Sequence, residues 1–371
     1  MIIKTKTLQD NCKKILDAVD TSTGFSVSET LELEVREQSL YLNVTNREYY
    51  VSVRMPLGAD EDFHAVVDAK VFLSLISKLT TGDVELRTTD TMLLMKADGS
   101  YKIPLIYDDE GKMASLPKIV IGNVTNSFPM KNSVLQSILK YNSKELLKAG
   151  SVREVQKLFY IDQDGALTFS TGACVNAFSL EQPLNIYLNE KTVKLFKLFS
   201  TDVMFSIGQD ELGGTSGKVV TKVSFDGGDV LLVSILNIDS SITNTFPVKA
   251  IRNLASRNYE HSVTLDKDAV LGALNRLLVF TTKSSSAYTY MVFGRETVTI
   301  YDTRKDNYEV IGYPNATLDM DEDYTAMFIT SDLKLTLESC DDKYVNLGFG
   351  NHTAVTISRG TIKNIIPECI Q

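Results

Sequence analysis

The chain has 371 residues and is 43% hydrophobic, which is sufficient for two or three domains with hydrophobic cores. Its apolar runs are shorter than the ~18 residues of a membrane helix, and its first residues lack the apolar core of a signal peptide, so we expect a cytoplasmic protein without a membrane partner. The four cysteines are scattered without a CxxC pair, which argues against structural zinc and a disulfide framework, and the net charge of −9 argues, as a sum, against a nucleic-acid partner.

The first third of the chain predicts two helices and six strands. Leu8, Cys12, Ile15 and Val19 recur at helical spacing and define one face of a helix. Apolar residues then alternate with polar ones, as in half-buried strands, and Gly82 ends a second amphipathic helix. The predicted helices cover 7–20 and 68–80, and the predicted strands cover 31–35, 40–44, 49–55, 84–88, 92–96 and 100–106.

The same order of elements is predicted twice more along the chain. The second unit has predicted helices over 131–149 and 189–200 and strands over 157–161, 166–170, 203–207, 219–225 and 229–235. The third unit has predicted helices over 266–283 and 331–340 and strands over 288–293, 297–302, 308–313, 344–349 and 353–358. In 331–340 the leucines alternate and fit a strand equally well; we predict a helix there because the corresponding element of the other two units is one.

Repetition of this pattern predicts an α+β protein of three similar domains, each with two helices packed against antiparallel sheets. The predicted domains are 1–118, 119–245 and 246–371, with linker segments at 107–127 and 237–259. The calcium-loop-like run 162–165 lacks the downstream glutamate and is predicted to be a β-turn.

Positive charge is concentrated in the six predicted helices. They carry 15 Lys and Arg against 10 Asp and Glu, a net +5, whereas the rest of the chain is −14. Lys191, Lys194 and Lys197 lie three apart, on the side opposite the apolar residues of their helix. One such helix is explained by an ordinary solvated face. A set of them in an acidic chain favours a surface that contacts the phosphate backbone without reading bases.

Three runs of sequence resemble the bacterial-type sliding clamp, the beta subunit of DNA polymerase III: 67–79 (VDAKVFLSLISKL), 151–153 (SVR) and 273–280 (ALNRLLVF). The resemblance covers essentially the whole chain at low identity. It implies the DNA clamp fold, in which one chain is half of a closed ring, two chains join head to tail, and the helices line the hole. It also implies double-stranded DNA, bound without sequence specificity, a replicative DNA polymerase and a clamp loader as partners.

The resemblance further implies three sets of residues with a role. The expected DNA-contacting residues are the helix cations Lys13, Lys14, Lys70, Lys78, Lys140, Lys144, Lys148, Lys191, Lys194, Lys197, Lys267, Arg276 and Lys334. The expected pocket for a partner peptide consists of Arg153, Val155, Thr171, Ala173, Cys174, Val175, Pro247 and Ile357. The expected dimer interface includes Tyr101, Ile103, Val279, Phe280, Tyr308 and Val310, on edge strands of the two chains.

The sequence departs from the family at two places. The family's Thr-Asp-Gly-His-Arg-Leu at the pocket is replaced by 171–176 (TGACVN), so we expect a more apolar groove with a different peptide preference; alternatively, Cys174 and Val175 only fill the core and partners bind elsewhere. The family also ends shortly after a strand that corresponds to 355–359, whereas here twelve residues follow. Such divergence is expected of a clamp encoded by a phage or plasmid with its own polymerase.

The sequence holds no pattern that indicates catalysis. His64, His261 and His352 are far apart in the sequence, and there is no GxGxxG, P-loop or GxSxG motif. We therefore expect neither an enzyme nor a cofactor. The alternative function is a structural or adaptor protein built from repeats that does not bind DNA; an enzyme would need a catalytic cluster.

Overall fold

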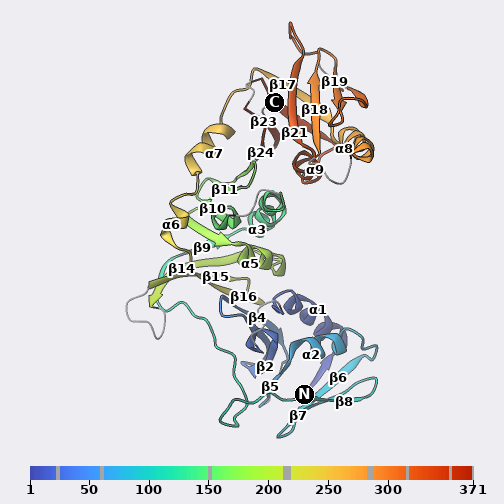
Figure 1. The fold of residues 1–371 in the computed structure, drawn as a ribbon. Coiled ribbons are helices and arrows are strands. Elements are labelled where there is room, and N and C mark those ends of the chain that lie inside the picture. Colours follow the sequence, from blue (N-terminus) through green and yellow to red (C-terminus); the bar gives the residue numbers. More distant parts are fainter. Residues whose placement is uncertain are drawn as a thin grey trace. The chain divides into compact units, whose positions relative to one another are not determined.

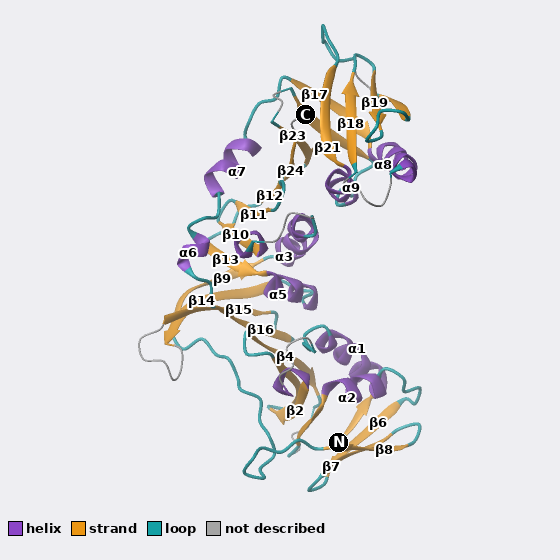
Figure 2. Cartoon of the chain, viewed as in Figure 1, coloured by secondary structure: helices purple, strands orange, loops and turns teal. Residues whose placement is uncertain are grey.

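The structure is a computed structural model that describes residues 1–21, 26–58, 62–148, 153–211, 219–281, 287–314, 317–350 and 353–369 (Figures 1 and 2). It is a mixed α and antiparallel β structure, as predicted. The chain forms two compact units, which we describe separately. Unit 1 consists of Met1–Leu135 and Lys194–Asn237, and unit 2 of Gln136–Val193 and Ile238–Gln371.

Unit 1 is built on an eight-stranded antiparallel sheet that joins distant parts of the sequence. Its central pairing places β4 beside β16, with Val51 opposite Leu232. In order, its strands are β5 (His64–Asp68), β2 (Thr30–Arg36), β3 (Ser39–Thr45), β4 (Tyr49–Pro56), β16 (Val230–Leu236), β15 (Val219–Asp226), β14 (Val203–Glu211) and β9 (Val124–Met130). A second sheet has the order β1 (Ile2–Lys4), β6 (Asp83–Thr88), β7 (Met92–Lys96) and β8 (Ser100–Pro104).

Two helices of unit 1 pack side by side, α1 (Thr5–Leu16) and α2 (Ala69–Ile76) (Figure 1). Leu8 and Ile15 of α1 are fully buried, as the helical spacing predicts. Asp68 caps α2, because its carboxylate accepts a hydrogen bond of 2.7 Å from the backbone N–H of Val71. The polar faces of both helices are therefore left to the solvent.

Unit 2 repeats this plan with a second eight-stranded sheet. In order, its strands are β13 (Asn185–Asn189), β10 (Leu158–Asp162), β11 (Gly165–Phe169), β12 (Ala173–Ala177), β24 (Ile362–Pro367), β23 (Ala354–Arg359), β22 (Tyr344–Phe349) and β17 (His261–Asp266). A four-stranded sheet has the order β20 (Tyr308–Gly312), β19 (Thr297–Tyr301), β18 (Tyr288–Phe293) and β21 (Tyr324–Ile329). Unit 2 also holds α6 (Ser240–Thr243), α7 (Val248–Ala255), α8 (Lys267–Leu277) and α9 (Thr330–Glu338).

The prediction of a helix over 331–340 is confirmed by α9, although the leucine alternation also fitted a strand. Leu333 and Leu337 are both 1% exposed and lie four residues apart, on one helical face. The ends of the predicted helices 131–149 and 266–283 lie outside the described residues. The domain boundaries at 118/119 and 245/246 remain predictions.

The predicted second-unit helix over 131–149 is not one regular helix. It consists of α3 (Asn132–Ser137), a π-helical turn (Ile138–Asn142) and α4 (Ser143–Leu146). The helix predicted over 189–200 is likewise α5 (Glu190–Lys194) followed by a 3₁₀ turn (Leu195–Leu198). Among the described residues, none of the helices is both long enough and apolar enough to cross a membrane.

Unit 1 buries one carboxylate in its eight-stranded sheet. Glu32, whose side chain is 2% exposed, accepts a hydrogen bond of 3.0 Å from Asn43 Nδ2 and lies 3.1 Å from His64 Nε2. The hydrogen bond to Glu32 raises the pKa of His64. Burial alone would raise the pKa of Glu32, but its hydrogen bonds from His64 and Asn43 outweigh burial and lower it.

The Glu32–His64 pair predicts a pH dependence of stability. The raised pKa of His64 gives stability that is present below its ordinary pKa of about 6.5 and is lost as pH rises through the folded value; the lowered pKa of Glu32 gives stability that is present above about 4.3 and is lost as pH falls. The contribution is therefore largest between pH about 4.3 and 6.5. It is expected to stay below about 1 kcal/mol because His64 is partly exposed.

Urea unfolding at pH 6 and pH 9 measures this contribution. The free energy of unfolding should fall more between these pH values in the wild type than in Glu32→Gln. An equal fall in both proteins would show that the pair does not contribute.

Candidate functional site

The cations predicted to contact DNA in unit 1 are all at its surface. Lys13, Lys70 and Lys78 are exposed, and among the described residues none of them has a hydrogen-bond or ion-pair partner for its ammonium. Lys14 and Lys197 are paired. The Lys14 ammonium lies 2.7 Å from Asp229, and the Lys197 ammonium lies 2.8 Å from Asp17. Lys194 is also exposed.

Most of the corresponding cations of unit 2 are bound within the protein. Lys140 is paired with Asp341, and Lys334 lies 3.8 Å from Glu338. Arg276 makes two hydrogen bonds of 2.6 and 2.7 Å to the carboxylate of Glu309. Lys144 is exposed, Lys191 is half-buried, and half-buried Lys267 donates to the carbonyl of Cys340.

Lys148 must be withdrawn from the DNA-contacting set. Its side chain is 2% exposed, and its ammonium lies 2.7 Å from the equally buried carboxylate of Glu145. Ser170 Oγ donates a hydrogen bond of 2.7 Å to the other oxygen of Glu145. The spacing of four residues from Lys144 assumed a continuous helix, whereas α4 ends at Leu146 and Lys148 lies beyond it.

A buried polar network holds the π-helical turn against the sheet of unit 2. Asn142 Nδ2 donates to the carbonyl of Ala166 at 3.2 Å and to Thr168 Oγ1 at 3.3 Å. Thr168 Oγ1 donates to the carbonyl of Asn142, and Asn176 Nδ2 donates to its side-chain oxygen. The network was not predicted, although the predicted helix carries polar residues at inward positions, which is the signal that indicates such a network.

The residues of the predicted partner pocket do not all lie together. Val155, Ala173 and Val175 belong to one apolar cluster, in which Val248 of α7 also packs. Thr171 Oγ1 donates a hydrogen bond of 2.5 Å to the buried carboxylate of Asp332. Arg153 is exposed and lies two residues before Val155 in the sequence, and Pro247 is the N-cap of α7.

Cys174 and Ile357 are corrections to the predicted pocket, because both are fully buried. Side chains alternate along β12, so Cys174 points to the face opposite Ala173 and Val175. Burial also raises the pKa of the Cys174 thiol. Ile357 belongs to a separate hydrophobic core. The burial of Cys174 agrees with the alternative interpretation, in which it fills the core.

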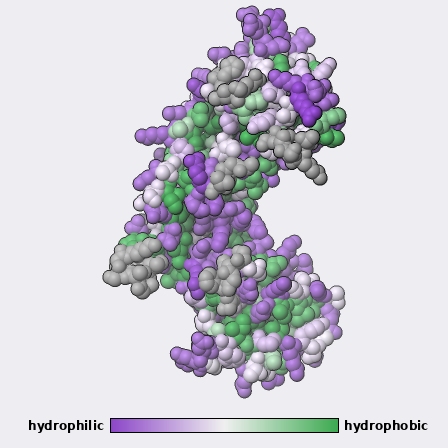
Figure 3. All heavy atoms as spheres, in the orientation of Figure 1, coloured by the Kyte–Doolittle hydropathy of each residue, from purple (hydrophilic) through white to green (hydrophobic). Residues whose placement is uncertain are grey.

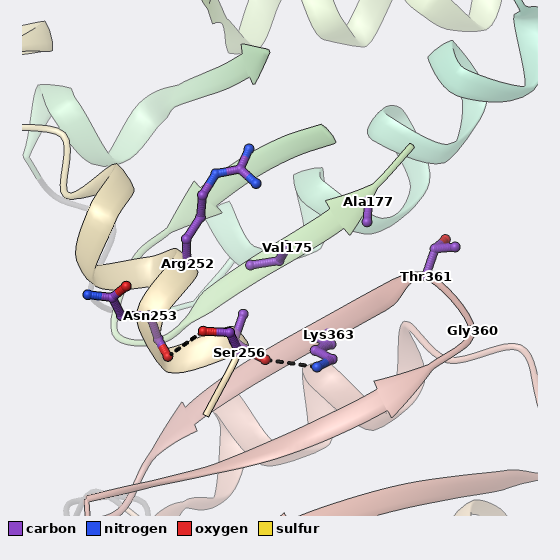
Figure 4. Close-up of a pocket in the computed structure, with 9 residues that line it drawn as sticks. Val175, Ala177, Arg252, Asn253, Ser256, Gly360, Thr361 and Lys363 are labelled. Carbon is purple, nitrogen blue, oxygen red and sulfur yellow. Dashed lines mark hydrogen bonds between the residues drawn. The ribbon is translucent and has the colours of Figure 1, made fainter. Parts of the chain in front are cut away.

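A surface cavity of about 440 Å³ lies beside the apolar cluster (Figure 4). Val175 and Ala177 of β12 form part of its wall, and of the predicted pocket residues only Val175 lines it. Arg252 Nη2 donates to both carboxylate oxygens of Asp162, and Lys363 Nζ donates to the carbonyl of Ala255. Its lining residues are Val175, Ala177, Arg252, Asn253, Ala255, Ser256, Gly360, Thr361 and Lys363.

The segment after Arg359 contributes Gly360, Thr361 and Lys363 to this cavity. It includes β24, which pairs with β12 on one side and with β23 on the other. In this register Lys363 lies opposite Val175, so β24 places a cation beside the cavity's apolar wall. Neither β24 nor α7 is predicted from the sequence; α7 supplies Arg252, Asn253 and Ala255 to the lining, and β24 supplies Lys363.

The predicted dimer residues lie on or near two edge strands. β8 is the edge of the small sheet of unit 1, and β20 is the edge of the small sheet of unit 2. Near β20, hydrophobic side chains reach the surface beside α8, as Figure 3 shows. The exposed fractions are 78% for Val279, 56% for Phe280, 60% for Tyr308 and 55% for Val310.

On the β8 side one residue is a correction. Ile103 is 3% exposed and packs into unit 1, so it does not contribute its side chain to an interface. Tyr101 is half-buried. The described residues include no group of three or more His, Cys, Asp or Glu side chains that could hold a metal ion.

The fold is that of the bacterial sliding clamps. The structure of DNA polymerase III subunit beta from Pseudomonas aeruginosa matches with a TM-score of 0.80 at 14% identity, covering 100% of both chains. The beta subunit from Thermotoga maritima matches with a TM-score of 0.80 at 13% identity, covering 100% of this chain and 99% of that one. The Helicobacter pylori beta clamp bound to a DNA ligase peptide matches with a TM-score of 0.74 at 15% identity, covering 100% and 99%.

The N-terminal part of the sequence also matches this family. Residues 1–110 match the family model "DNA polymerase III beta subunit, N-terminal domain". No curated protein matches the sequence. The resemblance to the DNA polymerase III beta subunits is thereby confirmed, by the family model over residues 1–110 and by the fold over the whole chain, at low identity.

Proposed function

We propose that this protein is a DNA sliding clamp, a non-enzymatic processivity factor that encircles duplex DNA and tethers a replicative DNA polymerase to it. The observation that carries the proposal is the structural match to beta subunits of DNA polymerase III, which covers the whole of this chain and 99–100% of theirs. The basic helices support it, because a ring that moves along DNA needs contacts with phosphates and none with bases.

In the proposed assembly, two chains form a ring by joining head to tail. β8 of one chain pairs with β20 of the other, since each is a sheet edge with unpaired backbone groups. Val279, Phe280, Tyr308 and Val310 are covered at this joint. Large apolar side chains exposed together on one surface are typical of protein interfaces.

The DNA-facing surface in this proposal is formed by the helix cations that remain exposed. Lys13, Lys70, Lys78 and Lys144 are the first candidates, because their ammonium groups have no partner among the described residues. Such contacts give binding that is independent of sequence and weakens as salt concentration rises. A clamp loader places the ring on DNA.

We place the partner site at the cavity of Figure 4, with Val175 and Ala177 as its apolar wall. The H. pylori clamp of the same fold has been crystallised with a peptide of DNA ligase. The occupant here is a short peptide of the polymerase that inserts apolar anchors, since a few buried side chains dominate such interfaces. Lys363 lies at the cavity without a carboxylate partner among the described residues and favours a peptide that carries an acidic residue, whereas the charge of Arg252 is paired with Asp162.

Ala177→Glu tests this location. Ala177 is exposed, so a glutamate there should leave the fold intact while it fills the cavity. Binding of the cognate polymerase, measured by surface plasmon resonance, is expected to weaken by roughly tenfold or more. The matched control is Ala250→Glu, which adds the same charge at an exposed alanine of α7 outside the cavity. Equal binding by the two variants would move the partner site elsewhere.

A low-resolution image of the particle tests the assembly. We expect a closed ring with a hole wide enough for a hydrated DNA duplex. A solid particle or an open arc would instead favour the structural or adaptor protein that does not bind DNA.

A further inference from the structure

Three of the helix cations that were predicted to contact DNA are held by aspartates from other parts of the fold. The pairs are Lys14–Asp229 at 2.7 Å, Lys197–Asp17 at 2.8 Å, and Lys140–Asp341. In each pair the lysine belongs to a helical segment, and the aspartate lies at a helix end or in a turn.

The two pairs of unit 1 lie around the end of α1. Asp17 is the C-cap of α1, whose last turn contains Lys14, and Asp229 immediately precedes β16. A carboxylate at a helix C-terminus is disfavoured by the helix dipole, so helix stability does not account for Asp17. All four side chains are between 33% and 45% exposed, which leaves the two ammonium groups accessible to a phosphate.

The pair of unit 2 is also an exposed ion pair between a lysine and an aspartate, but its aspartate has further partners. Asp341 accepts hydrogen bonds from Lys140 and, at 2.9 Å, from the hydroxyl of Tyr141, and its carboxylate lies 3.0 Å from Arg359 Nη1. The hydrogen bond from Lys140 is the main cause that holds the pKa of Asp341 well below its usual range, so Asp341 stays ionised at neutral pH. Lys140 and Asp341 are about half exposed.

We infer that Asp17, Asp229 and Asp341 compete with DNA phosphates for Lys197, Lys14 and Lys140, and thereby weaken the hold of the clamp on DNA. A phosphate must displace the carboxylate before it can bind the lysine, and the carboxylate also repels it. An exposed ion pair is weak enough for this exchange to occur. The inference rests on the proposed function and adds to it a cause for free movement along the duplex.

The test removes each carboxylate without changing its size. Binding of the full-length protein to a fluorescent 30-base-pair duplex is measured by anisotropy over a range of salt concentrations. Asp17→Asn, Asp229→Asn and Asp341→Asn are each expected to tighten binding by roughly two- to fivefold, and each should steepen the salt dependence by at most about one released ion. Asp164→Asn is the matched control, because Asp164 lies exposed in a β-turn away from these lysines and its carboxylate has no partner among the described residues.

A second set of variants separates pairing from general repulsion. Asp229→Asn is expected to tighten binding in the wild type but not in Lys14→Gln, because the lysine that it would release is absent. An equal gain in both backgrounds, or no gain beyond that of Asp164→Asn, overturns the inference. If instead the wild-type protein is not retained on a circular plasmid after loading, the proposed function itself fails.

Discussion

Phe280→Asp is expected to convert the proposed dimer into monomers. Phe280 is 56% exposed and its neighbour Val279 is 78% exposed, so both leave apolar surface in water in the isolated chain. Covering each one at the proposed joint would stabilise the dimer by about 1.5–3 kcal/mol. Aspartate removes this gain and adds the cost of burying a charge. A loss of about 3 kcal/mol at each joint corresponds to weakening by roughly two orders of magnitude.

Sedimentation velocity at micromolar concentration measures this effect. The matched control is Tyr344→Asp, which places the same charge at another exposed aromatic residue of unit 2, outside the proposed joint. The control should remain dimeric. A Phe280→Asp protein that sediments as the wild type does would place the dimer interface on a different surface.

Breaking the buried Glu145–Lys148 pair is expected to destabilise unit 2 strongly. Glu145→Gln leaves the ammonium of Lys148 buried without its counter-charge, and Lys148→Met does the same to the carboxylate of Glu145. Removing one partner of a buried ion pair costs about 3–5 kcal/mol. The double variant has no unpaired charge, and the expected loss is much smaller than the sum of the two single losses.

Urea unfolding of the four proteins gives the coupling between the two side chains. Ser170 still offers a hydroxyl to the glutamine, which helps the double variant to keep one hydrogen bond. Single variants that lose less than about 1 kcal/mol each would mean that water reaches these groups and that the pair is not buried in solution.

The sequence could predict those helices and strands that bury one face and expose the other to solvent. Leu8 and Ile15 of α1 and Leu333 and Leu337 of α9 are buried at the predicted spacing, because a helical period leaves no other face for them. α7 could not be predicted in the same way, since only Ile251 and Ala255 are buried in it and it begins at a proline in a stretch typical of a linker.

The candidate site was less predictable because it depends on pairings between distant segments. The cavity brings together β12, α7 and β24, and a strand pairing such as Val175 with Lys363 leaves no mark in either segment alone. The position of Lys148 was wrong for a local reason, because nothing in the spacing of the lysines indicates that the helix ends at Leu146. Alternation along β12, in contrast, correctly separates Val175 from Cys174 once the strand is known.

Retention on circular DNA tests whether two chains of this protein close around the duplex. The protein is loaded onto a nicked circular plasmid by its clamp loader, and the complex is separated from free protein by gel filtration in moderate salt. We predict that the protein stays with the circle and is released when a restriction enzyme cuts the plasmid once, because a ring slides off a free end. Protein that remains bound after the cut, or that never stays with the circle, would show that the chains do not form a ring around DNA.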